Sequence, residues 1–437
     1  MTATALIAGS PLAEARRARF HGCLLGGAVG DALGAPVEFL KRAEILRAFG
    51  SGGIRDMAPA YGRIGAITDD TQMAAFTAEG LLRAQTRLDS KGICHPPSVM
   101  ARAYQRWLYT QGESHPLQQG ALDGWLIRQA DLHAQRAPGN TCLDALRALR
   151  DIGQPACNHS KGCGGIMRVA PVGMFFAAKA GDAADTASPD RLRACFDLGC
   201  EAAGLTHGHV TGQLSAGAYA ALIFCALTDR DLDAAIDAVL ALLETRAGHE
   251  ETATALRRAR ESAAREPASP DALARLGGGW VAEEALAIGV YCALSTQRFE
   301  EGVILAVNHS GDSDSTGLLT GHLLGAVQGL SAIPERWLAP LELRDVLEQL
   351  ADDLLVSGRP ASLQDERCAR HARLSRTPPR RLDRIEAAAR GEMAVLRRPA
   401  SGQPAYSKTS VRMSATIAPA TAIRTRSVPQ TIHSCPG

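Results

Sequence analysis

The chain has 437 residues, 46% of them hydrophobic and only 4% aromatic, which provides enough apolar material for a large buried core. Its net charge of +1 combines two unlike parts, because residues 365–437 hold 14 Lys and Arg against 5 Asp and Glu while the rest of the chain is acidic. A mildly acidic main part argues against a nucleic-acid-binding core. The apolar residues are rich in Ala and Leu, which favours helix over sheet.

The first predicted helix spans residues 13–33, and glycines recur at every fourth position along it and just beyond: Gly22, Gly26, Gly30 and Gly34. Each Gly costs a helix about 1 kcal/mol relative to Ala, so the repetition indicates a geometric need. Either this face packs closely against a neighbouring helix, or it leaves backbone space for a ligand. Asp31 and Glu38 argue against a membrane span in this region.

The N-terminus and the cysteines bear on the cellular compartment. Residues 1–10 lack the basic start of a signal peptide. The 11 cysteines are an odd number without a C-x-x-C pair, and several lie in apolar stretches where Cys behaves as a small hydrophobe. We therefore expect a cytoplasmic protein in a reducing environment, with no membrane partner.

A Gly-rich loop over residues 50–66 leads to a first acid cluster, Thr68-Asp69-Asp70-Thr71, before a long predicted helix over residues 70–87. Ser, Thr and Asp are favoured at helix starts because their oxygens accept orphan backbone N–H bonds and the dipole favours negative charge. A helix cap needs only one side-chain oxygen, and this cluster has more than one. On a helix, the side chains of Asp69 and Asp70 would point roughly 100° apart. Diverging carboxylates can reach two ions about 3.5–4 Å apart, the spacing of two-metal sites.

The segment Lys161-Gly162-Cys163-Gly164-Gly165-Ile166-Met167-Arg168 is a second glycine-rich element. Backbone without bulky side chains lets N–H groups approach phosphate oxygens. A flexible connector is the alternative, although the apolar run over residues 169–175 favours a fixed element. Farther along, His207 precedes a small-residue helix. A lone His is more often a structural hydrogen-bonding residue than a ligand.

A second acid cluster, Asp312-Ser313-Asp314-Ser315-Thr316, also precedes a predicted helix, residues 317–330. Asp312 and Asp314 could converge on one ion. So many hard oxygen ligands suit Mg²⁺ or Mn²⁺ better than zinc or copper. For either cluster alone, a well-capped helix remains the alternative, whereas the two together predict a metal site for hydrolytic chemistry.

Strand-like alternation is nearly absent, and helical periodicity predicts further helices at 98–111, 141–151, 190–202, 211–228, 231–245, 251–265, 281–295, 298–307 and 341–356. We expect an all-α domain over residues 15–357, a compact orthogonal multi-helix fold. The basic segment over residues 358–437 is expected to be largely disordered. A nucleic-acid-binding arm in this tail is the less favoured interpretation.

Seven segments resemble, in order along the chain, motifs of the ADP-ribosylglycohydrolase family, which includes the dinitrogenase reductase-activating glycohydrolases. They are Gly26–Glu38, Thr68–Met73, Arg136–Thr141, Lys161–Pro171, Thr206–His209, Gly278–Leu286 and Asn308–Ser315. Each motif alone is weak, but seven in family order are specific, and together they cover roughly residues 18–345. The resemblance implies an all-α fold with a binuclear metal cleft holding two Mg²⁺ or Mn²⁺ ions. It also implies hydrolysis of the bond between C1″ of ADP-ribose and a protein side chain or small leaving group.

The resemblance also implies roles for individual residues. The expected metal ligands are Thr68, Asp69, Asp70, Asp312, Asp314 and Ser315. Ser315 stands where many members have Thr, but it keeps the hydroxyl. Glu38 matches an acidic residue assigned in some members to catalysis at the scissile bond. The expected substrate-binding residues are Gly164, Gly165 and Met167, in a loop that cradles the diphosphate, and His207, near the ribose.

The expected activity is metal-dependent removal of ADP-ribose by cleavage of an N- or O-glycosidic bond, with Glu38 as general base or general acid. The substrate would be an ADP-ribosylated protein or a small ADP-ribosyl conjugate. One alternative is an immunity or binding protein that neutralises an ADP-ribosyltransferase partner by occluding its active site. Another is a metal-dependent phosphohydrolase acting on a free nucleotide. The sequence leaves open the leaving group (arginine, serine, O-acetyl-ADP-ribose or another), the choice of Mg²⁺ or Mn²⁺, and the oligomeric state.

Overall fold

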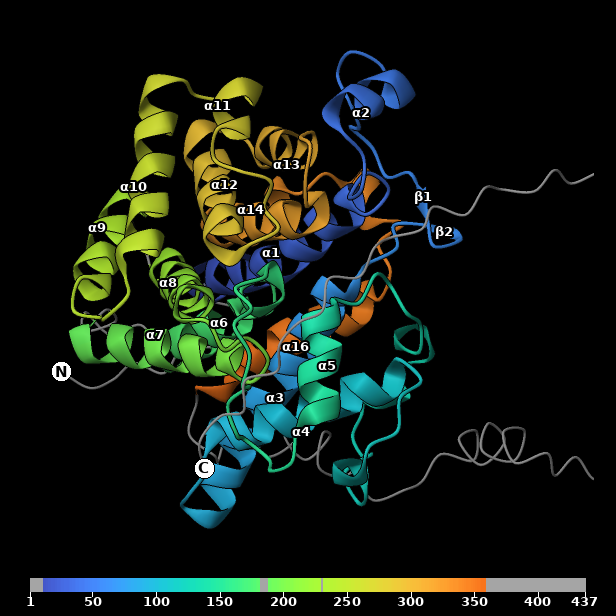
Figure 1. Cartoon of the computed structure of the whole chain (residues 1–437), viewed down its shortest axis with the longest axis vertical. Coiled ribbons are helices and arrows are strands. Elements are labelled where there is room, and N and C mark those ends of the chain that lie inside the picture. The colour runs from blue at the N-terminus through green and yellow to red at the C-terminus, as the bar shows by residue number, and fades with distance from the viewer. Residues whose placement is uncertain (1–10, 181–187, 229–230, 359–437) are drawn as a thin grey trace, which may run out of the picture. The chain divides into compact units, whose positions relative to one another are not determined.

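The computed structural model describes residues 11–180, 188–228 and 231–358, all within one compact unit of the chain. In these residues, sixteen α-helices provide most of the regular structure, and the only strands form one short hairpin (Figure 1). The helices are α1 (Pro11–Gly34), α2 (Arg42–Phe49), α3 (Asp69–Lys91), α4 (Pro96–Thr110), α5 (Asn140–Ala148), α6 (Ala170–Ala180), α7 (Pro189–Gly204), α8 (Val210–Leu227), α9 (Leu232–Leu243), α10 (Glu250–Arg265), α11 (Pro270–Ala274), α12 (Ala282–Ser295), α13 (Phe299–Val307), α14 (Ser313–Gln328), α15 (Glu335–Leu338) and α16 (Arg344–Ser357). The prediction of an all-α fold is confirmed.

Most predicted helices are present with their ends shifted by a few residues, and the differences have local causes. α14 begins at Ser313 rather than at residue 317, so Asp314 and Ser315 lie inside its first turn. The helices α2, α11 and α15 are too short, at 8, 5 and 4 residues, to give a periodic pattern. The predicted tail over residues 358–437 lies, after its first residue, outside the described part of the chain.

The loop before the first acid cluster contains a two-stranded hairpin. Strand β1 (Pro59–Ala60) pairs antiparallel with β2 (Arg63–Ile64), with Ala60 opposite Arg63. Its turn residues Tyr61 and Gly62 both have positive φ, at 50° and 82°. Positive φ at both central positions matches the twist of a tight hairpin, but it is strained for an aromatic residue.

Glycines on both α1 and α14 bring these two helices into backbone contact (Figure 1). A Cβ atom added to Gly30 would lie 2.0 Å from the carbonyl oxygen of Gly317, and one added to Gly26 would lie 2.5 Å from that of Gly321. α14 and the residue after it thus have their own four-residue repeat: Gly317, Gly321, Gly325 and Gly329. Of the two interpretations of the α1 repeat, close packing against a neighbouring helix is confirmed.

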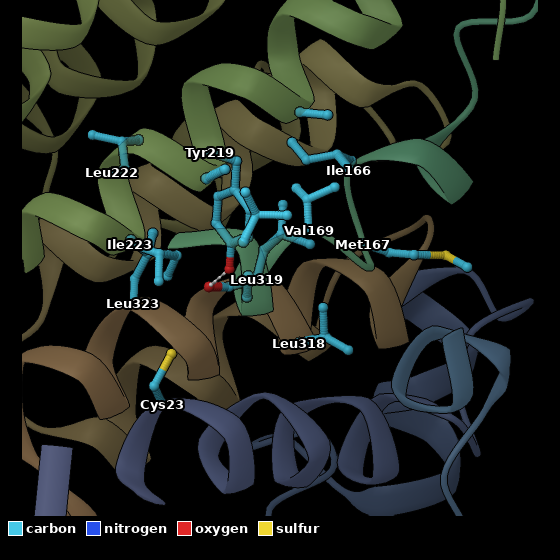
Figure 2. Close-up of a cluster of buried hydrophobic side chains, with 14 of the residues drawn as sticks. Cys23, Ile166, Met167, Val169, Tyr219, Leu222, Ile223, Leu318, Leu319 and Leu323 are labelled. Carbon is cyan, nitrogen blue, oxygen red and sulfur yellow. Dashed lines mark hydrogen bonds between the residues drawn. The ribbon is translucent and has the colours of Figure 1, made fainter. Parts of the chain in front are cut away.

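The hydrophobic core lies around α8, which packs against α6, α7, α9, α12 and α14. Figure 2 shows part of it, where Tyr219 of α8 donates a hydrogen bond from its hydroxyl to the carbonyl oxygen of Leu319 of α14 at 2.9 Å. Among the described residues, α8 alone has the length and hydropathy of a membrane span, but 89% of it is buried in the protein. Its apolar character is therefore accounted for by the core.

Candidate active site

The start of α3 presents the first acid cluster with its backbone already capped. Thr68 is the N-cap residue, and its Oγ1 accepts the N–H of Asp70 at 3.3 Å. Asp31 of α1 accepts the backbone N–H groups of Thr68 at 3.0 Å and of Thr71 at 3.2 Å. Because Thr68 and Asp31 supply the capping oxygens, the carboxylates of Asp69 and Asp70 are not needed for that purpose. Helix capping alone does not explain this cluster.

Ser315 joins the two acid clusters. Its hydroxyl donates to Oδ2 of Asp70 at 2.7 Å, a contact between residues 245 positions apart. Asp312 precedes α14, and its N–H donates to the carbonyl oxygen of Gly278 at 2.8 Å. Asp314 lies in the first turn of α14, where its Oδ1 accepts the N–H of Ser315 at 3.0 Å. All four carboxyl and hydroxyl side chains are buried, so the clusters form one buried acidic group.

Glu38 adds a third segment to this group, from the turn that follows α1. Oxygens of Glu38, Asp312 and Asp314 lie within 4.8 Å of one another. Glu38 Oε2 and Asp312 Oδ2 are buried and have no hydrogen-bond partner among the described residues. Burying an unpaired carboxylate costs free energy unless a proton or a cation neutralises its charge. The carboxylates of the two acid clusters and the hydroxyls of Thr68 and Ser315 are hard oxygen donors, which fit Mg²⁺ or Mn²⁺.

Burial raises the pKa of every carboxyl in the group. Desolvation, followed by the charges of Asp314 and Asp312, raises the pKa of Glu38 to about 10. Desolvation and the charge of Asp314 also raise the pKa of Asp31 to about 7. The pKa values of the other four carboxyls shift upward, with desolvation the largest cause in each: Asp69, Asp70, Asp312 and Asp314. Full ionisation of the group at neutral pH therefore requires a compensating cation.

The glycine-rich loop forms a short 3₁₀ turn, η4 (Cys163–Gly165), that packs on the imidazole of His207. A Cβ atom on Gly164 would lie 3.1 Å from Cε1 of His207. His207 is buried, its Nδ1 is 2.8 Å from Oγ1 of Thr206, and desolvation lowers its pKa to about 3. His207 is thus a neutral side chain that supports the loop.

A buried guanidinium connects the loop to this histidine. Arg168 donates to the carbonyl oxygen of Gly164 at 3.0 Å and to Oγ1 of Thr206 at 2.6 Å. Its Cζ lies 4.5 Å from the centre of the Tyr104 ring. The hydrogen bonds of Arg168 to described residues go to carbonyl, hydroxyl and sulfur atoms, and none goes to a carboxylate. A buried cation paired in this way favours an anion at the neighbouring loop.

The sequence over residues 12–363 matches the ADP-ribosylglycohydrolase family. The chain belongs to this family. It is 26% identical to the ADP-ribosyl-[dinitrogen reductase] glycohydrolase of Rhodospirillum rubrum, over 78% of this chain and 97% of that protein. It is 23% identical to the ADP-ribosylarginine hydrolase Tri1 of Pseudomonas putida (strain GB-1), over 77% of each chain. A solved structure described as an ADP-ribosylglycohydrolase-related protein complex aligns with a TM-score of 0.56 and 29% identity, over 79% of this chain and 100% of that one.

In this member of the family, the residues predicted from the two acid clusters and Glu38 are near neighbours. They are Glu38, Thr68, Asp69, Asp70, Asp312, Asp314 and Ser315. The predicted substrate-binding residues form an adjoining group around η4. Met167 differs from the rest, because its N–H donates to the carbonyl oxygen of Cys163 at 3.1 Å and its side chain is buried in the core (Figure 2). Its N–H is therefore engaged within the loop, and its contact with the diphosphate stays a prediction.

Several residues at the site were missed by sequence reasoning. Asp31 had a usable signal, since it is the only carboxylate within the glycine-spaced part of a buried helix. The sequence holds no such signal for Tyr61, because the position of this side chain depends on the hairpin turn. Desolvation and then the charges of Glu38 and Asp314 raise the pKa of its phenol well above the usual value. Cys163 also adjoins the cluster, where desolvation and the charge of Asp312 raise the pKa of its thiol.

Proposed function

We propose that this chain is a divalent-metal-dependent hydrolase that removes ADP-ribose from a modified protein side chain or a small ADP-ribosyl conjugate, in the cytoplasm. The observation that supports it most is the single buried group formed by Glu38 and two acid clusters some 240 residues apart. The family and the names of its relatives support an ADP-ribosyl hydrolase.

The proposed cofactor is a pair of Mg²⁺ or Mn²⁺ ions. The residues that would hold it are Thr68, Asp69, Asp70, Asp312, Asp314 and Ser315. When bound, such ions supply positive charge that orients sugar hydroxyls and favours ionisation of water. The unpaired oxygen of Asp312 and the upward pKa shifts of the acids support this assignment, since both are relieved by a cation.

Glu38 is the proposed catalytic residue. Hydrolysis forms a bond from the water oxygen to C1″, breaks the bond from C1″ to the leaving atom, and delivers one proton to that atom. Glu38 can hold this proton at its unpaired Oε2, acting as a general acid, or take one from water as a general base. Its burial limits the access of bulk water to this carboxyl.

The loop of Gly164 and Gly165 is the proposed contact for the diphosphate. Backbone without side chains permits close approach of phosphate oxygens, and the charge of Arg168 behind Gly164 favours an anion there. His207 would hold the loop in place rather than exchange protons, since its imidazole is buried and neutral. No observation supports an ADP-ribosyltransferase partner, and the buried acidic group favours a catalytic role over an occluding one.

The direct test is release of free ADP-ribose from a panel of mono-ADP-ribosylated substrates, linked through arginine, through serine or to acetate. The expected result is turnover of at least one substrate with Mg²⁺ or Mn²⁺ and none with EDTA. Undiminished turnover without divalent metal would remove the metal from the proposal. Release of phosphate instead of ADP-ribose would indicate the phosphohydrolase alternative.

A further inference from the structure

A surface pocket of about 660 Å³ lies toward the end of α3 that is remote from the acidic group. Its walls come mainly from the C-terminal half of α3, the loop that follows, and the first turns of α4, which packs against α3 (Figure 1). Arg87, in the pocket wall, lies 18 residues after Asp69, or about 27 Å along the helix at 1.5 Å per residue. The pocket is thus separate from the proposed catalytic site, and its volume is in the range that holds small organic ligands.

Three arginines line this pocket, and two of them have no acidic partner. Arg83 is neutralised by Asp123, 2.8 Å from its guanidinium, and by Glu79 at 3.7 Å. Arg87 lies one turn further along α3, and Arg102 belongs to α4. Among the described residues, neither Arg87 nor Arg102 forms an ion pair, and both are exposed. Like charges around one hollow repel one another, and an anion bound between them removes that repulsion.

The other charged groups near the pocket do not cancel its positive charge. Glu201 of α7 lies near His95, in the loop between α3 and α4, because burial raises the pKa of Glu201 and the charge of His95 opposes that shift. Burial likewise raises the pKa of the Cys94 thiol in the pocket wall, and the charge of Arg87 opposes the shift. One carboxylate against two unpaired guanidiniums leaves the pocket positive.

The pocket also has an apolar wall. Ile93 is 73% exposed, the highest exposed fraction of any large hydrophobic residue that the structure describes. Val99 of α4 and Ile152 are half-buried. Ser98 holds Ile152 in place, since its hydroxyl donates a hydrogen bond to the carbonyl oxygen of that residue at 3.3 Å. A ligand with an apolar ring would cover this wall while its charged end met the arginines.

We propose that this pocket binds a phosphate-bearing ligand of the nucleotide class, with the phosphates at Arg87 and Arg102 and the base against Ile93 and Val99. The planar fork of a guanidinium matches a phosphate group through two parallel hydrogen bonds. The base supplies the flat apolar part that free phosphate lacks. No residue of the acidic group takes part, so the proposal does not depend on the proposed function.

Two cysteines allow the pocket and the acidic group to be followed separately. Cys94 lines the pocket and Cys163 adjoins the acidic group, and both are partly exposed. The rate at which iodoacetamide alkylates each thiol is measured by mass spectrometry of the digested protein, at increasing ADP concentrations in EDTA. We expect ADP to slow the alkylation of Cys94, whatever its effect on Cys163. The ADP concentration at half-maximal protection of Cys94 gives the Kd of the pocket.

Arg87→Ala and Arg102→Ala are each expected to raise this Kd by about ten-fold, through the loss of a charge-assisted hydrogen bond. Arg102→Lys keeps the charge but not the fork, and should raise the Kd less than Arg102→Ala does. Arg265→Ala removes an exposed arginine at the end of α10, outside the pocket, and is the control with an unchanged Kd.

Pyrophosphate, which has no base, should protect Cys94 only at higher concentrations than ADP. Equal potency of the two would overturn the assignment of the apolar wall to a base. Protection that persists unchanged in both arginine-to-alanine variants, or no protection of Cys94 by either ligand, would overturn the proposal.

Discussion

Glu38 differs from an ordinary surface carboxylate in three respects. It is buried, one of its oxygens has no hydrogen-bond partner among the described residues, and burial with neighbouring acids raises its pKa to about 10. These are the properties of a group whose proton is available at neutral pH and whose environment changes that availability. The expected metal ligands share the burial, but Asp70 and Asp314 already accept hydrogen bonds.

Glu38→Gln is expected to reduce kcat by about 10²–10⁴-fold, the usual contribution of a general acid or base, because the amide cannot exchange the proton. Affinities for ADP-ribose and for Mn²⁺ should stay close to those of the unchanged protein, as measured by calorimetry. Glu261→Gln, which alters an exposed carboxylate on α10, is the control and should change nothing. Normal turnover by Glu38→Gln would show that the assigned role is wrong.

At the level of elements, the glycine contact between α1 and α14 determines where Asp31 and Asp314 meet. Asp31 follows Gly30, which touches Gly317, and Asp314 precedes Gly317 by less than one turn. The charge of Asp314 acts on Asp31 by electrostatic repulsion, which raises the pKa of that buried carboxyl. The separation of the two helix backbones therefore sets part of the geometry of the acidic group.

Gly30→Ala is expected to destabilise the protein by about 1–3 kcal/mol or more, because the new Cβ atom would overlap the backbone of α14. The midpoint of thermal or urea unfolding measures the effect. Gly52→Ala is a matched control: Gly52 is exposed, its φ is not positive, and the nearest atoms to its added Cβ belong to the flexible side chain of Arg55. Equal unfolding midpoints for both variants would contradict the inferred backbone contact.

A second contact of α1, with α16, predicts a dependence on pH. Asp352 accepts hydrogen bonds from Nε of Arg17 at 2.6 Å and from Nε2 of His21 at 2.9 Å. Burial opposes ionisation there, but the bonds from His21 and Arg17 outweigh it and hold the pKa of Asp352 well below its usual range. Because the pKa of Asp352 is lowered in the folded state, the contact stabilises the protein fully at pH values above the ordinary Asp pKa near 4. This stabilisation is lost as the pH falls below that value.

Asp352→Asn is therefore expected to flatten the loss of stability between about pH 4 and pH 2, the interval below the ordinary Asp pKa. Urea unfolding at a series of pH values gives the slope. At neutral pH the same variant should be less stable than the unchanged protein. Identical slopes in the acid range would show that Asp352 does not contribute to acid unfolding.

At the level of the whole molecule, the proposed metal site would link folding to metal binding, because its expected ligands come from two segments some 240 residues apart. A ligand that binds only the folded state at a hundredfold excess over its Kd stabilises it by about 2.7 kcal/mol. Mn²⁺ or Mg²⁺ should therefore raise the melting temperature by a few degrees, and EDTA should reverse the rise. Asp314→Asn should lose the response.

Asp345→Asn provides the control for this measurement. Asp345 also lies in the first turn of a helix, α16, but it is exposed and belongs to neither acid cluster. Its variant should keep the full response to metal. A melting temperature that does not change with metal or EDTA in the unchanged protein would contradict the metal assignment.

Much of the fold and of the acidic group could be predicted from the sequence, because its signals are local. Thr68, Asp69 and Asp70 adjoin one another, as do the residues around Asp314, so each cluster is visible as a string. Local signals do not show which distant segments contact one another. The sequence alone did not connect the glycines of α1 with those of α14. The stacking of the Phe39 ring on the Trp280 ring was missed for the same reason, since the two residues are far apart in the chain and neither position is unusual alone.

The contact between α1 and α14 also limits how this protein can change over time. Where a side chain meets a side chain, a larger residue on one helix can be accommodated by a smaller one on the other. At the contacts of Gly26 with Gly321 and of Gly30 with Gly317, both partners are already the smallest residue. No second substitution can make room for a first. Descendants of this chain are thus expected to vary in the loops around the site while keeping these positions fixed.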